Sequence, residues 1–192
     1  MRIILTLIAT LGFLEHAAAE EPAPPLVVEP NAFSYTFGVP DGWAFSFEQA
    51  REFGLPLVFF IAGESFHSSH AVMYVNEGCR SDCAGTVQEV IDRIVGSAAA
   101  RSPELQVADE ESIEIDGGPT VPVKILTGSS DERQAREALA FIEHPESVLL
   151  LVLSTMDEST WDADYQAFRT AVEGHRFFTC SSPDLRVECE QE

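Results

Sequence analysis

The sequence predicts an α+β sandwich, in which helices pack on the faces of a mainly antiparallel β-sheet. Residues 57–61 and 148–153 are continuously apolar, which is typical of central strands covered on both faces. Several shorter segments alternate apolar and polar residues, with the period of half-buried strands. Two segments have helical spacing. Neither follows a repeating βα pattern, so the sequence does not predict a Rossmann fold or a barrel.

The N-terminal half of the domain is predicted to begin with strands joined by turns. Residues 33–37 alternate aromatic and polar side chains, and residues 39–42 follow with the proline and glycine of a turn. Residues 43–51 form a second strand or begin a short helix, and Gly54 ends this segment. Residues 71–75 are expected to form a further strand.

A long helix is predicted to begin after Thr86. The segment Thr86-Val87-Gln88-Glu89 matches a capping box, in which the threonine and glutamate side chains each accept a hydrogen bond from a backbone N–H at the helix start. One apolar stripe follows at the spacing i, i+3, i+4, i+7 and i+8, formed by Val87, Val90, Ile91, Ile94 and Val95.

The middle of the chain is predicted to be a run of antiparallel strands. Residues 113–115 and 121–125 alternate on either side of Asp116-Gly117-Gly118, which is typical of a hairpin turn. Residues 138–143 and the apolar segment 148–153 are expected to add two more strands.

A second helix is predicted near the C-terminus, with Gly174 as its stop. Trp161, Tyr165, Phe168 and Val172 recur at helical spacing, which favours one buried stripe over a ligand cage. The tail from residue 180 has little apolar content, and we expect it to be irregular.

The first nineteen residues have the layout of a secretory signal. Arg2 is followed by an apolar stretch over residues 3–14 and by Ala17-Ala18-Ala19, where cleavage is expected. This stretch is shorter than the roughly 20 apolar residues of a membrane span. We therefore expect a secreted or periplasmic protein with no membrane span after cleavage. The predicted parts are a signal peptide (1–19), a Pro-rich leader (20–32), one α+β domain (33–178) and a disulfide-bearing tail (179–192).

The formal net charge is −21, from 32 acidic and 11 basic residues. A chain this acidic repels phosphate backbones and anionic lipids, so it is not expected to bind nucleic acid or a membrane surface. Keeping an exported protein soluble is a sufficient reason for this charge. The alternative is that the charge attracts a basic protein partner or a cation.

The four cysteines, an even number in a chain predicted to be exported, indicate two structural disulfides. Four cysteines allow three pairings. We favour Cys79–Cys83 and Cys180–Cys189, because each closes a short local loop. A redox pair or a metal site is less consistent with the C-x-x-x-C spacing and with the absence of histidine at zinc-finger spacing.

The segment Tyr35-Thr36-Phe37-Gly38-Val39-Pro40-Asp41-Gly42-Trp43 resembles an early strand and turn of the PsbP/Mog1-like α/β/α sandwich superfamily. The later order of strands and helices is also similar, so the resemblance covers residues 33–178. Members of this superfamily are mostly binding or assembly modules, among them photosystem-associated lumenal proteins and a nuclear GTPase-binding protein. The resemblance implies a scaffold that binds an unknown protein or small ligand. The signal peptide and cysteines depart from the nuclear branch, so its function is not carried over.

The segment of residues 63–70 offers a carboxylate, hydroxyls and two imidazoles between two predicted strands. Glu64, His67 and His70 are its candidate binding residues. A serine hydrolase elbow needs G-x-S-x-G, but His67 stands at the last glycine position and a strand follows. Metal binding by the two histidines, with Glu64 as a third ligand, fits their i, i+3 spacing on a helix or turn but not on a strand. A polar loop with solvated or hydrogen-bonded histidines is the alternative.

Two other features are ambiguous or weak. Trp43, next to Gly42, is either a core residue or an exposed anchor. The acidic clusters at 109–111 and at 157–164 lack a calcium-binding loop pattern, so solvated faces and helix N-terminal acids explain them.

The function favoured by the sequence is a secreted or periplasmic, non-enzymatic binding or assembly module. Its predicted contact region comprises the Gly63–His70 loop and the turn that contains Trp43. No cofactor or metal is assigned. The alternative is a small envelope hydrolase or metal-dependent enzyme that uses the same loop, and a purely structural envelope component is a third possibility.

Overall fold

The computed structural model describes residues 26–28, 33–79, 85–128, 136–144, 147–181 and 188–191. Across this part of the chain, two sheets are present, and every strand pairing is antiparallel. The larger sheet comprises β3 (Trp43–Ser46), β4 (Val58–Ile61), β5 (Ala71–Cys79), β6 (Gln106–Glu114), β7 (Thr120–Thr127), β8 (Arg136–Glu143) and β9 (Val148–Thr155). The smaller sheet comprises β1 (Leu26–Val28), β2 (Phe33–Thr36), β10 (Arg176–Ser181) and β11 (Glu188–Gln191). The helices are α1 (Phe47–Glu52), α2 (Val87–Arg101) and α3 (Trp161–Glu173), with a short 3₁₀ turn, η1 (Glu158–Thr160), before α3.

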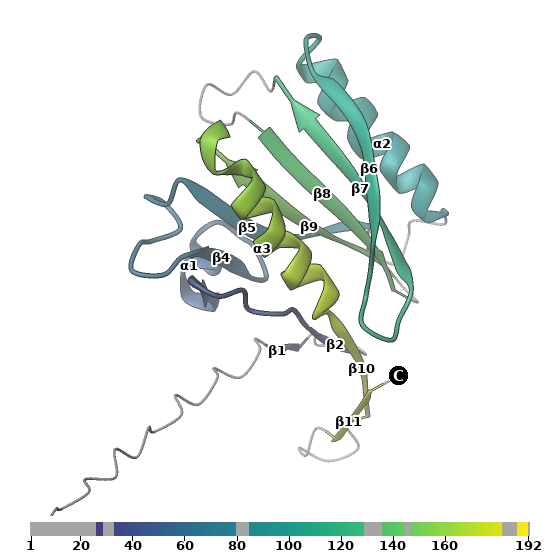
Figure 1. Cartoon of the computed structure of the whole chain (residues 1–192). Helices are drawn as coiled ribbons and strands as arrows, with labels where there is room; N and C mark the ends of the chain where they lie inside the picture. The colour runs from purple at the N-terminus through teal and green to yellow at the C-terminus, as the bar shows by residue number, and fades with distance from the viewer. Residues whose placement is uncertain are drawn as a thin grey trace, which may run out of the picture.

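The larger sheet has the strand order β3-β4-β5-β9-β8-β7-β6 (Figure 1). The apolar strand β9 lies at its centre, and all eight of its residues are buried. Strand β4 lies between β3 and β5 and is also buried on both faces. The α+β class, the mainly antiparallel sheet and both predicted central strands are therefore confirmed.

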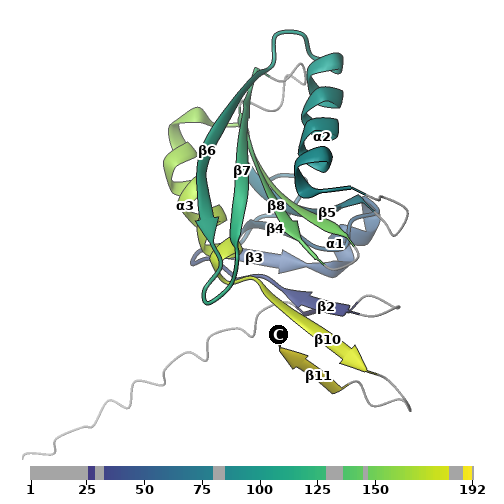
Figure 2. The same cartoon turned by 90° about the vertical axis from the view of Figure 1, so that its right-hand side faces the viewer.

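Helices cover both faces of the larger sheet, with α3 on one face and α1 and α2 on the other (Figure 2). The side chains of each strand alternate between these faces, as the strand period requires. On β9, Leu149, Leu151 and Leu153 pack in the α3 layer, whereas Leu150 and Val152 pack against α2. Trp161, Phe168 and Val172 supply the apolar stripe of α3, as its spacing predicts.

The predicted start of α2 is confirmed in its hydrogen bonds. The Thr86 N–H donates to Glu89 Oε2 at 2.7 Å, and the Glu89 N–H donates to Thr86 Oγ1 at 3.3 Å. These reciprocal bonds satisfy backbone groups that a helix start leaves without intrahelical partners. Val90 and Ile91 are the buried residues of this helix.

Two expectations about the ends of the chain are corrected. Residues 26–28, within the predicted leader, form β1 and pair with β2. The tail, expected to be irregular, contains the β10–β11 hairpin. Strand β2 also belongs to the smaller sheet, where it pairs with β10. Pairing of this kind uses backbone hydrogen bonds, which do not need an apolar side-chain pattern.

Two of the cysteines occupy paired positions in the backbone register of this hairpin. Cys180 and Cys189 are directly opposite partners in the register of β10 and β11. Cys79 ends β5, whereas Cys83 lies outside the described residues. The pairings Cys180–Cys189 and Cys79–Cys83 remain predictions.

Candidate functional site

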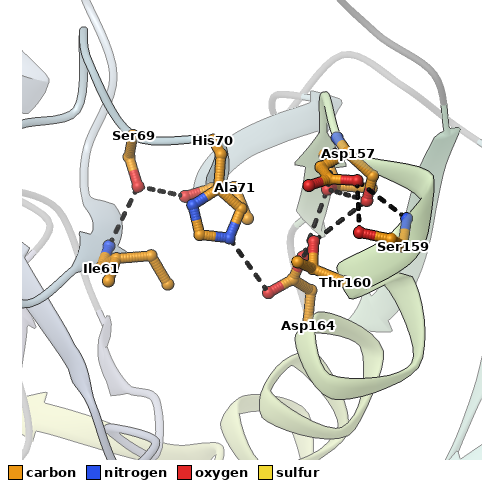
Figure 3. Close-up of polar contacts among 9 residues, drawn as sticks. Ile61, Ser69, His70, Ala71, Asp157, Ser159, Thr160 and Asp164 are labelled. Atoms are coloured by element: carbon orange, nitrogen blue, oxygen red, sulfur yellow. Dashed lines mark hydrogen bonds and ion pairs between the residues drawn. The ribbon is translucent and has the colours of Figure 1, made fainter.

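The loop between β4 and β5 is held by its own serines. The hydroxyls of Ser65 and Ser68 are hydrogen-bonded at 2.8 Å, and the Ser65 N–H donates to Ser68 Oγ at 3.2 Å. Ser69 is 2% exposed. Its hydroxyl accepts from the Ile61 N–H at 3.2 Å and donates to the Ala71 carbonyl at 2.8 Å (Figure 3). These hydroxyls shape the loop.

Phe66 fastens this loop to α1. The Phe66 N–H donates to Gln49 Oε1 at 2.8 Å, and its ring lies edge-to-face with Phe53, with the ring centroids 5.1 Å apart. Phe53 is 51% exposed, while Phe66 is half-buried. We call this pair of rings the Phe53–Phe66 patch. Exposed polar residues border it in sequence: Arg51, Glu52, Glu64 and His67.

His70, at the end of the loop, is placed beside the start of α3. Its carbonyl accepts a hydrogen bond from the Met156 N–H at 2.8 Å. Its Nε2 lies 4.0 Å from Asp164 Oδ1, and its ring points toward that carboxylate (Figure 3). This separation exceeds a hydrogen bond but permits electrostatic attraction when the imidazole is protonated.

Asp164 is an acid of the first turn of α3, as the helix N-terminal explanation of residues 157–164 predicts, but it is buried rather than solvated. It is 4% exposed, and its Oδ2 accepts from the hydroxyl of Thr160 at 2.6 Å (Figure 3). The Thr155 hydroxyl donates to the same oxygen at 3.2 Å. Position 164 is three residues after Trp161 and four before Phe168, so it lies on the buried face of the helix. That spacing was visible in the sequence.

Asp157 keeps the predicted role of a helix-start acid. Its carboxylate accepts from the Ser159 N–H at 2.9 Å and from the Ser159 hydroxyl at 2.7 Å. These two hydrogen bonds lower the pKa of Asp157, with a smaller contribution from His70.

The other two loop candidates do not join His70. Glu64 and His67 are exposed, whereas His70 turns toward α3. In the part of the chain that the structure describes, no three His, Cys, Asp or Glu side chains gather closely enough to hold a metal ion. The loop therefore does not assemble Glu64, His67 and His70 as one ligand set.

Trp43 is a core residue. It is 9% exposed and belongs to the same apolar cluster as Phe59 and Trp161. The core alternative therefore describes this side chain, and the anchor alternative is corrected: the alternation of residues 43–47 directs Trp43 and Phe45 into the α3 layer.

A pocket of about 220 Å³ lies at the opposite end of α3, where three elements meet. The β6–β7 turn, the end of β8 and the start of β10 contribute its lining: Ile115, Asp116, Gly117, Gly118, Pro119, Ile142, Glu143, His144, His175, Arg176 and Phe177. His144 and His175 are 6% and 3% exposed, and their Nε2 atoms are 3.3 Å apart. Sequence reasoning missed both. They are 31 residues apart, and no local spacing links them.

The buried pair remains neutral over a wide pH range. Burial lowers the pKa of His144 to about 4. Burial, followed by the proximity of His144, lowers the pKa of His175 to about 3, with a further lowering from Arg176. The backbone carbonyl of Thr36 acts in the opposite direction. Imidazoles perturbed in this way, at a pocket, are typical of functional sites, although structural networks also produce them.

The fold is similar to two solved structures. LpqN, a protein involved in cell envelope biogenesis of Mycobacterium tuberculosis, aligns with a TM-score of 0.52 and 14% identity over 78% of this chain and 86% of its own. The cyanobacterial PsbP protein CyanoP from Synechocystis sp. PCC 6803 aligns with a TM-score of 0.44 and 16% identity over 88% of this chain and 97% of its own. No protein-family model matches the sequence, and no curated protein matches it.

The architecture defines this chain as having the PsbP/Mog1-like fold, the fold of LpqN. The resemblance drawn from residues 35–43 and from the order of elements is thus confirmed at the level of the fold. Among the described residues, no helix is both long and apolar enough to cross a membrane.

Proposed function

We propose that this protein is a secreted or periplasmic binding module that recognises a protein partner through the Phe53–Phe66 patch and the neighbouring loop. The observation that carries the proposal is Phe53, an aromatic side chain that is 51% exposed yet fixed in place by a second ring. Large aromatic side chains are frequent energetic centres of protein interfaces.

The construction of the patch supports this function. Phe66 is anchored by Gln49 and packs on Tyr74 as well as on Phe53, with the Phe66–Tyr74 centroids 6.5 Å apart. The serine turn fixes the loop behind it. A preformed surface of this kind loses little conformational entropy on binding. The acidic residues Glu52 and Glu64, together with the net charge of −21, favour a partner with basic residues around its apolar contact.

An extracytoplasmic location is part of the proposal. It is supported by the signal-like residues 1–19 and by the fold shared with LpqN, which acts in cell envelope biogenesis. The fold alone does not specify function, so the proposal of partner binding depends on the Phe53–Phe66 patch.

Loss of the exposed ring is expected to weaken partner binding. We expect Phe53→Ser to lower the affinity for the partner at least tenfold, because about 1.4 kcal/mol of lost contact energy corresponds to that factor. A photo-crosslinking amino acid at position 67 in the native host would capture the partner, and its affinity would then be measured with purified proteins.

Val107→Ser is the matched control. Val107 is 40% exposed, but it lies on the edge strand β6 rather than at the patch. The proposed surface would be contradicted if Phe53→Ser and Val107→Ser bound the partner as tightly as the parent protein. It would also be contradicted if both variants lost affinity to the same extent.

The alternative, a small envelope hydrolase or metal-dependent enzyme that uses the loop, has one favourable observation in the His70–Asp164 pair. However, the hydroxyls of Ser65 and Ser69 are engaged in holding the loop, and Glu64 and His67 do not accompany His70. We therefore favour binding.

The cysteine pairing provides a test of the proposed compartment. Directly opposite residues of an antiparallel pair have Cα atoms about 4.5–5.5 Å apart, within the range that a disulfide spans. We expect Cys180 and Cys189 to be joined in protein isolated from its own source, with an N-terminus at Glu20. Peptide mapping under non-reducing conditions measures both features. Free thiols at these positions, or an N-terminus at Met1, would contradict the proposed export.

A further inference from the structure

The buried pair His144 and His175 is not used by the proposed recognition surface. His144 follows β8, while His175 lies between α3 and β10. The two rings line the pocket beside the β6–β7 turn, and their centroids are 5.4 Å apart. The two histidines are distant in the sequence, and only the fold brings their ring nitrogens together.

Burying two imidazoles stabilises the core less than burying apolar side chains would. Removing a polar group from water carries a free-energy penalty that hydrogen bonds inside the protein only partly offset. Apolar side chains of similar size would fill the same space without that penalty. Places where a sequence departs from simple core packing are often functional sites.

We propose that His144 and His175 bind one divalent transition-metal ion of the Zn²⁺ and Cu²⁺ class through their Nε2 atoms. Two imidazole nitrogens, each about 2.0–2.1 Å from a tetrahedral Zn²⁺, lie about 3.3 Å from each other. The two Nε2 atoms already have a separation of 3.3 Å. The ion would replace the proton between the rings, and that proton would move to Nδ1 of its own ring, so binding releases no net proton.

The surroundings hold the two rings in this orientation. The ring centroid of Phe177 lies 4.4 Å from that of His144, edge-to-face, and the centroid of Phe37 lies 4.8 Å from that of His175. Tyr35 lies near both imidazoles, with ring centroids at 6.0 and 6.3 Å. Ring packing of this kind limits rotation of the two imidazoles, and the apolar shell around a metal site controls solvent access.

The pocket supplies access, and two of its three charged lining residues are acidic. Asp116 and Glu143 line it together with the histidines and Arg176, whose Nη2 lies 3.5 Å from Asp116 Oδ2, and the whole chain carries a net charge of −21. No third His, Cys, Asp or Glu side chain completes a close ligand set within the described residues. Water or a small ligand from the pocket would fill the remaining coordination positions.

Cobalt titration of the full chain, without an affinity tag, tests this site. Four-coordinate Co²⁺ absorbs strongly in the visible range and is a spectroscopic substitute for Zn²⁺. At pH 7.5 we expect one Co²⁺ per chain with a four-coordinate spectrum, displaced by Zn²⁺. The double variant His144→Gln, His175→Gln should bind Co²⁺ at least tenfold more weakly. The absence of this spectrum in the parent protein, or equal binding by the variant, would overturn the proposal.

Glutamine is chosen because its amide can still make one hydrogen bond across the pair. A purely structural pair would therefore survive the substitution, whereas a metal site would not. His67→Gln with His70→Gln is the matched control for binding at exposed histidines, and it should leave the titration unchanged. If the His144, His175 variant fails to fold, electron paramagnetic resonance of Cu²⁺ bound to the parent protein decides. Splitting by two nitrogen nuclei supports the site, and a purely oxygen-ligated spectrum overturns it.

Discussion

Gly174→Ala is expected to destabilise the protein by about 2–3 kcal/mol, because the new methyl group would collide with backbone. A Cβ at position 174 would lie 2.7 Å from the Cα and 2.9 Å from the N of Gly38. Backbone atoms cannot rotate away as a flexible side chain can. The reciprocal change, Gly38→Ala, would place its Cβ 2.6 Å from the Thr170 carbonyl oxygen.

This contact joins the start of the domain to the end of α3. The Gly38 N–H donates to the Ala171 carbonyl at 3.2 Å, and Gly174 follows the last turn of the helix. Forcing the two segments apart would therefore disturb packing around Phe37 and His175, which lie next to these glycines in sequence. Urea denaturation followed by circular dichroism measures the change in the free energy of unfolding.

Gly96→Ala is the matched control. Gly96 lies within α2, where a Cβ would meet nothing within 4 Å. Alanine there should stabilise the helix by about 0.5–1 kcal/mol, because glycine loses more backbone entropy on folding. A Gly174→Ala protein as stable as the parent would show that the close approach does not limit packing.

The position of this glycine was predictable from the sequence, but its role was not. Gly174 ends α3 as expected, yet its φ is −80°, so it does not supply the left-handed conformation of a typical helix stop. It is required because a distant segment passes within contact distance. Local sequence contains no information about that neighbour.

The same distinction separates the predicted elements from the missed ones. The capping box at Thr86, the apolar strand β9 and the stripe of α3 follow from spacing within one segment, and all three are present. Strand β1 and the β10–β11 hairpin depend on backbone pairing between segments of weak pattern. The Gly63–His70 loop was located correctly between two strands, but the direction of each side chain was not predictable.

The histidines that line the pocket could not be predicted from the sequence. The two loop histidines, His67 and His70, drew attention because they lie close together in sequence. In the structure, one is exposed and the other turns toward Asp164. The histidines that do meet, His144 and His175, are each flanked by unremarkable residues.

The metal-free protein is expected to lose stability as the pH falls from about 6.5 to about 4, because of the buried histidine pair. Folding lowers the pKa of His144 to about 4 and that of His175 to about 3, from the ordinary histidine value of 6.5. Between these values, the unfolded chain binds protons that the native protein does not bind. The free energy of unfolding therefore decreases as the pH decreases, and the contribution levels off once the native imidazoles are protonated.

The expected loss from this pair is on the order of 5 kcal/mol over that range, since each pKa unit corresponds to about 1.4 kcal/mol and the two sites interact. Arg176 faces the pair and opposes its protonation, while Asp116 and Glu143 line the same pocket. Neutralisation of the many surface carboxylates acts differently, because it relieves the self-repulsion of a chain with a net charge of −21. The total pH profile of one protein therefore mixes both effects.

A comparison of variants separates the effect of the buried histidines from that of the surface carboxylates. Urea denaturation between pH 7.5 and 4.5, in the presence of a chelator, should give a clearly flatter stability profile for His144→Gln, His175→Gln than for the parent protein. The control variant His67→Gln, His70→Gln also removes two histidines, both outside the pocket, and it should reproduce the parent slope. Parallel profiles for all three proteins would mean that the buried imidazoles titrate alike in the folded and unfolded states. That result would contradict their burial as the cause of acid sensitivity.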